Sequence, residues 1–103
     1  MSAVKATASK PLMRWVLYLL ECRGGSYYAG ITTDLARRFA EHQAGTGGRY
    51  TRAHRPIRIV ASRQYPDRSS ASRAEYVLKQ LPRKDKPGYF LLENTLSESA
   101  TNR

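Results

Sequence analysis

Side chains that can do chemistry are concentrated between residues 16 and 42, which read VLYLLECRGGSYYAGITTDLARRFAEH. The segment contains two tyrosines ten residues apart, Tyr18 and Tyr28, followed by Arg38 and His42. Arg38 and His42 are four residues apart, so on a helix they lie on one face, one turn from each other. Phenol and imidazole groups can transfer protons and a guanidinium group can bind an anion, so this segment is a candidate site.

The second chemical signal is the positive charge of the chain. Eighteen Lys and Arg residues against eight Asp and Glu residues give a formal net charge of +10. Such an excess favours a polyanionic partner, because each phosphate that is contacted releases counterions. Charge alone leaves three kinds of partner open, which are nucleic acid, an anionic membrane surface and an acidic protein.

A glycine-rich segment that becomes basic and aromatic, GTGGRYTRAHRP, occupies residues 45–56. We expect a loop here that runs through about residue 55. Basic side chains interleaved with aromatic ones suit phosphate contact combined with stacking on bases or sugars, although a mobile surface loop is the alternative. The residues that we expect to bind nucleic acid are Arg37, Arg49, Tyr50, Arg52, His54 and Arg55.

The two tyrosines are expected on a β-hairpin. Residues 14–23 are rich in strand formers, Gly24-Gly25 is a hairpin signal, and residues 26–31 form the returning strand. Gly30 interrupts the second strand, which is typical of a bulge or of a close approach by a ligand. Arg38 and His42 are expected on the next helix, over residues 35–44, with N-cap options at residues 32–34 and Gly45 at its end.

The remaining elements complete the sheet and add helices. PIRIVASRQY at residues 56–65 predicts a third strand, and Ser69 or Ser70 can cap a helix over residues 71–81. Glu75 lies on the flank of the apolar stripe of that helix. A short last helix over residues 83–94 is expected to be broken by Pro87-Gly88. The order ββαβαα predicts an α+β fold, a small three-stranded antiparallel sheet flanked by helices.

Length and composition predict one small domain. We expect a flexible tail at residues 1–13, the domain at residues 14–94 and a second flexible tail at residues 95–103. The longest apolar run is far too short to span a bilayer, and no secretory signal is visible, although a transit peptide is an alternative to a solvated first tail. Cys22 is the single cysteine, which excludes an intramolecular disulfide and a cysteine cluster for zinc. These features fit a cytoplasmic protein.

The ordered set of motifs resembles the GIY-YIG nuclease superfamily. VLY ends at Tyr18, YAG begins at Tyr28, Arg38 and His42 share a helix, and Glu75 lies on a later helix. Taken singly, the tyrosines could be ordinary strand aromatics, and His42 and Glu75 could be surface residues. It is the set in this order that carries the resemblance.

The resemblance runs from about Trp15 to Leu81 and is closest to small single-domain bacterial members. Through the loop from Gly47 to Arg52, the sequence is also similar to the nuclease domain of a subunit that cuts branched DNA. The first glycine of the family motif is replaced here by Val16. This departure affects backbone packing more than chemistry.

The resemblance implies a role for each candidate residue. Glu75 would hold a single Mg²⁺ or Mn²⁺, and Arg38 would bind the scissile phosphate. One of Tyr18 and Tyr28 would be the general base while the other orients water, and which is which stays open. His42 would act as a base or as a phosphate ligand.

The implied activity is metal-dependent hydrolysis of phosphodiester bonds in DNA by an endonuclease, selective for branched or flapped structures. The alternative is a catalytically weak nucleic-acid-binding module of the same fold. We expect DNA more than RNA as the partner, no membrane, and a monomer or weak dimer. Specificity would come from the basic surface or from a protein partner.

Overall fold

The structure is a computed structural model that describes residues 13–91. Its elements are, in chain order, β1 (Trp15–Cys22), β2 (Tyr27–Thr32), α2 (Leu35–Ala44), α3 (Arg49–Ala53), β3 (Pro56–Tyr65), α4 (Arg68–Gln80) and the 3-10 turn η2 (Arg83–Asp85). Both expected tails, except for Met13, lie outside the described residues, as does the end of the expected domain. Within residues 13–91, no helix is long and apolar enough to cross a bilayer.

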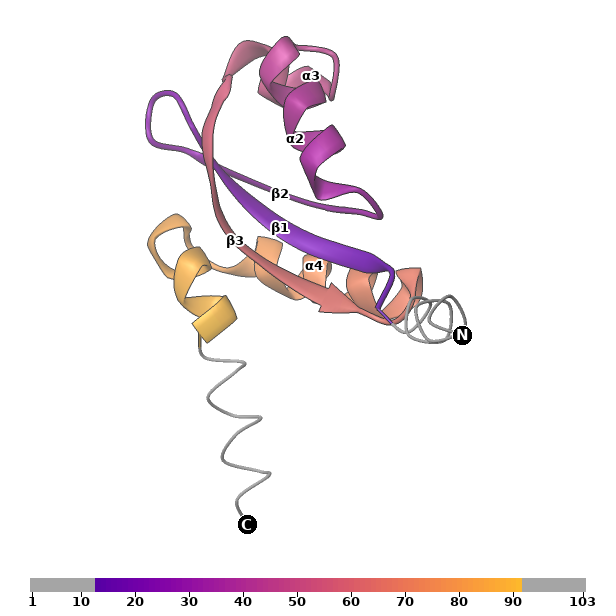
Figure 1. Cartoon of the computed structure of the whole chain (residues 1–103). Helices are drawn as coiled ribbons and strands as arrows, with labels where there is room; N and C mark the ends of the chain where they lie inside the picture. The colour runs from indigo at the N-terminus through magenta and orange to yellow at the C-terminus, as the bar shows by residue number, and fades with distance from the viewer. Residues whose placement is uncertain (1–12, 92–103) are drawn as a thin grey trace, which may run out of the picture.

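The three strands form one antiparallel sheet with β1 in the middle (Figure 1). The strand order is β2-β1-β3, so β2 and β3 are the two edges. Tyr18 at the centre of β1 pairs with Gly30 on β2 and with Ser62 on β3. The predicted α+β class and the three-stranded antiparallel sheet are confirmed.

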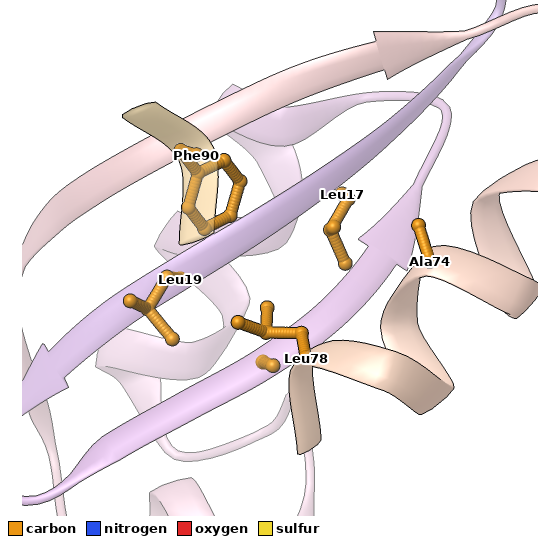
Figure 2. Packing of buried hydrophobic residues seen from close by; sticks show 6 residues of the cluster. Leu17, Leu19, Ala74, Leu78 and Phe90 are labelled. Atoms are coloured by element: carbon orange, nitrogen blue, oxygen red, sulfur yellow. The ribbon is translucent and has the colours of Figure 1, made fainter. Parts of the chain in front are cut away.

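Different helices cover the two faces of the sheet (Figure 1). One face packs against α4 around a buried apolar cluster (Figure 2), which consists of Leu17, Leu19, Ala29, Ala74, Leu78 and Phe90. Fully burying one such leucine contributes about 1.5–3 kcal/mol, so this face supplies much of the stability. Successive side chains of a strand point to opposite faces, so Tyr18 points away from this cluster and toward α2.

Glycines and side-chain caps define the turns beside the candidate site. Gly24 and Gly25 have φ angles of 88° and 87°, and they make the hairpin turn between β1 and β2. The side chain of Asp34 accepts a hydrogen bond from the backbone N–H of Arg37 and begins α2. Gly45, with φ of 87°, ends the helix in the left-handed conformation. The predicted bounds of this helix and of the third strand agree with the structure.

Three sequence expectations about the later helices are wrong. The expected loop contains the short helix α3, which brings Thr51 into the interior. Asp67, and not Ser69 or Ser70, caps α4 by accepting a hydrogen bond of 2.7 Å from a backbone N–H, so the helix begins three residues earlier than predicted. Pro87-Gly88 lies inside the helical residues 86–91 because proline is tolerated in the first turn of a helix.

Candidate functional site

A buried hydrogen bond joins the middle of the sheet to α2. The hydroxyl of Tyr18 lies 2.9 Å from Nε2 of His42. His42 is fully buried and Tyr18 is 1% exposed, so neither is the surface residue or plain strand aromatic that was the alternative. The sheet and the helix are thus held together by a polar pair, which must be satisfied because both groups are out of contact with water.

Tyr28 completes an aromatic group around this pair. Its ring meets the ring of His42 edge to face, with a centroid distance of 5.0 Å and an interplanar angle of 61°. The rings of Tyr18 and Tyr28 are 6.5 Å apart. Tyr28 is half-buried, whereas Tyr18 is buried, so Tyr28 is the tyrosine that solvent or a ligand can reach.

Two glycines make room for the buried pair. A Cβ atom at Gly30 would overlap the phenol of Tyr18 on the neighbouring strand. A Cβ atom at Gly47 would lie 2.5 Å from Nδ1 of His42. The close approach predicted at Gly30 is therefore present, but the group that approaches is the side chain of Tyr18.

Thr51 extends the buried hydrogen bonds by one residue. Its Oγ1 lies 2.7 Å from Nδ1 of His42, and the side chain is fully buried although α3 lies in a basic, exposed segment. We did not predict a role for Thr51 from the sequence. The signal was weak, since it consists of one short polar residue among arginines in a segment that was expected to be a loop.

Arg38 lies between the hydrogen-bonded buried residues and the protein surface. Its guanidinium donates one hydrogen bond of 3.0 Å to Oε1 of Glu41 and one of 2.8 Å to the carbonyl of Gly47. Its positive charge also acts on Tyr18, where it favours the ionised form of the phenol. The side chain is 36% exposed, so a guanidinium with unused donors faces the surface beside the tyrosines.

Burial controls the protonation of the pair. Burial raises the pKa of Tyr18 to about 12, and the nearby Arg38 guanidinium only partly offsets this rise, while the charges of Tyr28 and, least of all, Glu75 add to it. Burial also lowers the pKa of His42 below its ordinary value, with the positive charge of Arg38 as the second cause. At neutral pH we therefore have a neutral phenol beside a neutral imidazole.

Glu75 lies on α4, the helix that covers the other face of the sheet. A hollow of about 360 Å³ beside the edge strand β2 is lined by Tyr27, Tyr28, Ala29, Tyr50, Lys79 and Lys86. Nζ of Lys79 lies 2.9 Å from Oε2 of Glu75. The hollow therefore joins the accessible tyrosine to the part of α4 that carries the carboxylate.

The donor set suits a hydrated metal ion and does not form a closed cage. In the described part of the chain, no group of three or more His, Cys, Asp or Glu side chains could hold a metal. Glu75 is a single carboxylate whose side chain is 22% exposed. Mg²⁺ keeps most of its water shell and is commonly bound by one or two carboxylates, so Glu75 fits such an ion.

An aromatic column extends outward from Tyr28. The rings of Tyr28 and Tyr50 are 6.0 Å apart and those of Tyr50 and His54 are 4.4 Å apart, each pair with an interplanar angle of 15°. Tyr50 and His54 are exposed. We predicted from the sequence that these two residues belong to a basic loop, and in the structure their rings stack in a column with Tyr28.

The four arginines that were predicted to bind nucleic acid differ in how free they are. Arg49 and Arg52 are exposed and line a hollow of about 450 Å³ together with Gly45, Thr46 and Gly48. Arg55 donates to the carbonyl oxygens of Gln43 in α2 and Arg52 in α3, so its guanidinium links these two helices. Arg37 is exposed on α2, where it forms only a loose ion pair of 3.8 Å with a carboxylate.

The sequence of this chain is similar to a known family of domains and to several bacterial proteins. A family model described as the GIY-YIG catalytic domain matches residues 14–89. A UPF0213 protein of Xanthomonas axonopodis pv. citri is 65% identical over 89 residues, which cover 85% of this chain and 87% of that protein. A UPF0213 protein of Xanthomonas campestris pv. campestris is 57% identical, covering 86% of this chain and 84% of that protein.

A solved structure has the same fold. The solution NMR structure of a protein of E. faecalis is 36% identical, with a TM-score of 0.55, over 81% of this chain and 88% of that one. The names of the relatives give no specific activity. The comparisons therefore support the fold and the membership of the family, and the chemistry has to be argued from the side chains.

Proposed function

Since the chain belongs to the GIY-YIG catalytic domain family, a family of nucleases, we propose that it is a metal-dependent endonuclease that hydrolyses phosphodiester bonds in DNA, selectively at branched or flapped structures. The observation that carries the proposal is the convergence of two tyrosines, an arginine and a histidine on one face of the sheet. Hydrolysis of a phosphodiester needs a cation at the phosphate and a proton acceptor for the attacking water.

Arg38 is the phosphate-binding group in this proposal. Its hydrogen bonds to Glu41 and Gly47 fix the plane of the guanidinium before a substrate arrives. A fixed guanidinium with remaining donors suits bidentate binding of a phosphate, whose charge grows in the transition state. Preorganised cations of this kind supply a large share of the rate enhancement of phosphoryl transfer.

Tyr28 is the tyrosine that we place at the attacking water. It is half-buried and lines the hollow near Lys79, whereas Tyr18 is buried and its pKa is raised to about 12 by burial. In the step, the Tyr28 oxygen accepts a proton from the attacking water and passes its own hydroxyl proton to solvent, while the water oxygen bonds to phosphorus. The bond from phosphorus to the leaving oxygen breaks, and that oxygen takes a proton from solvent. Tyr18 and His42 hold Arg38 and Tyr28 in place.

Glu75 would hold the Mg²⁺ or Mn²⁺ ion, which supplies positive charge for the phosphate and the leaving oxygen when bound. The carboxylate is ion-paired with Lys79, whose side chain is 52% exposed. Such an exposed ion pair is weak, so another cation can replace the Lys79 ammonium at the carboxylate. This exchange would leave the ammonium of Lys79 free at the hollow beside Tyr28.

The aromatic column and the exposed arginines support selectivity for branched or flapped DNA. Such structures present unpaired bases, and Tyr50 and His54 present ring faces for stacking, which contributes about 1–3 kcal/mol per base. Arg49 and Arg52 offer phosphate contacts beside the column. A net charge of +10 favours nucleic acid over an acidic protein, with DNA preferred to RNA and a protein partner able to add specificity. We place this activity in the cytoplasm, with the protein as a monomer or weak dimer.

A panel of labelled substrates tests this function. We expect nicking of branched or flapped DNA in Mg²⁺ or Mn²⁺, weaker cleavage of plain duplex DNA, and none in EDTA. Single-stranded DNA and RNA of matched length complete the panel. Binding of the panel without cleavage of any member would instead support a catalytically weak nucleic-acid-binding module.

A further inference from the structure

Three buried side chains form a row of hydrogen bonds behind the phosphate-binding arginine. Thr51 Oγ1 lies 2.7 Å from His42 Nδ1, and His42 Nε2 lies 2.9 Å from the Tyr18 hydroxyl. Thr51 and His42 are fully buried and Tyr18 is 1% exposed, so water does not complete these bonds. The direction of each bond must therefore follow from the groups themselves.

A neutral imidazole has one donor nitrogen and one acceptor nitrogen. If Nδ1 carries the proton, His42 donates to Thr51 and accepts from the Tyr18 hydroxyl. If Nε2 carries the proton, every bond is reversed, and the Tyr18 hydroxyl must find another acceptor. The two arrangements place the proton of Tyr18 in opposite directions.

The groups at the two ends decide between the arrangements. At one end, the carbonyl of Gly48 can only accept, and the Thr51 hydroxyl lies 3.5 Å from it as a donor. At the other end, the guanidinium of Arg38 can only donate, and its positive charge lies close enough to the Tyr18 oxygen to act on the pKa of the phenol. If every bond were reversed, the proton of the Tyr18 hydroxyl would point toward donors and would have no acceptor, which is unfavourable for a buried group.

We propose that Thr51 is a positioning residue that holds His42 in the Nδ1–H tautomer, so that the Tyr18 oxygen faces Arg38 as an acceptor. The proton order runs from the Tyr18 hydroxyl to His42, from His42 to Thr51, and from Thr51 to the Gly48 carbonyl. Its effect is to fix the guanidinium through Tyr18. The tautomer does not depend on the proposed nuclease activity, but its consequence for catalysis rests on it.

The ring nitrogens of His42 give a direct readout in the full chain. We expect a spectrum of ¹⁵N-histidine-labelled protein at neutral pH to show Nδ1 of His42 protonated and Nε2 unprotonated. His54 is the other histidine, and the variant His54→Gln assigns the signals. An Nε2–H tautomer in the unaltered protein would overturn the proposal, and this measurement needs neither substrate nor metal.

Matched variants test the role of Thr51. Thr51→Val keeps the shape and removes the hydroxyl, so we expect mixed tautomers and a fall in kcat of tenfold or more with KM little changed. Thr51→Ser keeps the hydroxyl and should retain the Nδ1–H tautomer and most of kcat. General acid–base catalysis typically contributes about 10²–10⁴-fold, so a partial loss of the alignment it depends on is measurable.

The two readouts separate the two proposals. A single Nδ1–H tautomer in Thr51→Val together with unchanged kcat would show that Thr51 does not position His42. An inactive unaltered protein with the Nδ1–H tautomer would sink the nuclease activity and leave the hydrogen-bond order standing. If Thr51→Val does not fold, the spectrum of the unaltered protein and the Thr51→Ser variant still decide.

Discussion

At the scale of single residues, the site depends on two glycines, which leave room for bulky neighbours, as much as on its functional groups. Tyr18 can reach His42 because Gly30, its partner on β2, has no side chain. The imidazole in turn sits against Gly47, where a Cβ atom would lie 2.5 Å from Nδ1. These glycines do not need a left-handed backbone, so their role is the close approach of a neighbouring side chain.

This geometry predicts that Gly30→Ala destabilises the protein by about 1–3 kcal/mol, because the added methyl group must displace the buried phenol of Tyr18. Gly88→Ala is the matched control, since no atom lies within 4 Å of its added Cβ. In its helical segment this alanine should stabilise by up to about 1 kcal/mol. Urea denaturation measures both, and equal effects of the two variants would contradict the close approach.

Sequence reasoning reached four of the residues that come together and missed one. The resemblance to the family motifs singled out Tyr18 and Tyr28 on adjacent strands and Arg38 and His42 on one helix, and the structure brings the four side chains together. Thr51 could not be found this way because its contact with His42 depends on the path of the intervening chain. No local periodicity encodes that path.

At the scale of elements, local chemistry explains which predictions succeeded. The helix α2 was bounded correctly because Asp34 and Gly45 are strong capping signals. The helix α3 was missed because five residues are too few to show a periodic pattern and the preceding glycines favour a loop. Burial of Thr51 against α2 stabilises the short helix, which is a tertiary effect.

Because α2 places a neutral His42 against the sheet, stability should depend on pH. Burial holds the pKa of His42 below the value of about 6.5 that it has when unfolded, so the unfolded chain binds the proton more readily. The stabilisation is present above that value and is lost as the pH falls below it, by at most about 1.4 kcal/mol per pH unit.

Urea unfolding at pH 7.5 and pH 5.5, above the range where most carboxylates titrate, measures this loss. The variant His42→Gln is the control, because it cannot gain the proton and should show a smaller dependence on pH. A stability that is equal at the two pH values in the unaltered protein would contradict a buried, neutral imidazole.

At the scale of the whole molecule, the proposed site uses both faces of the sheet. The tyrosines and Arg38 lie on the face covered by α2 and α3, while Glu75 belongs to α4, which packs on the other face (Figure 1). Tyr28 and Lys79, the ion-pair partner of Glu75, both line the hollow at the edge strand β2. A site of this kind stays open to a long polymer, as an endonuclease requires.

The measurement that tests the central claim most directly compares the unaltered protein with Glu75→Gln on one branched DNA in Mg²⁺. We predict that Glu75→Gln binds the DNA with an affinity within a few-fold of the unaltered protein and cleaves it at least 100-fold more slowly, in line with loss of a metal ligand. Asp85→Asn, which removes one negative charge from η2, is the control and should cleave normally. Cleavage by Glu75→Gln at the rate of the control would contradict a metal-dependent nuclease centred on Glu75.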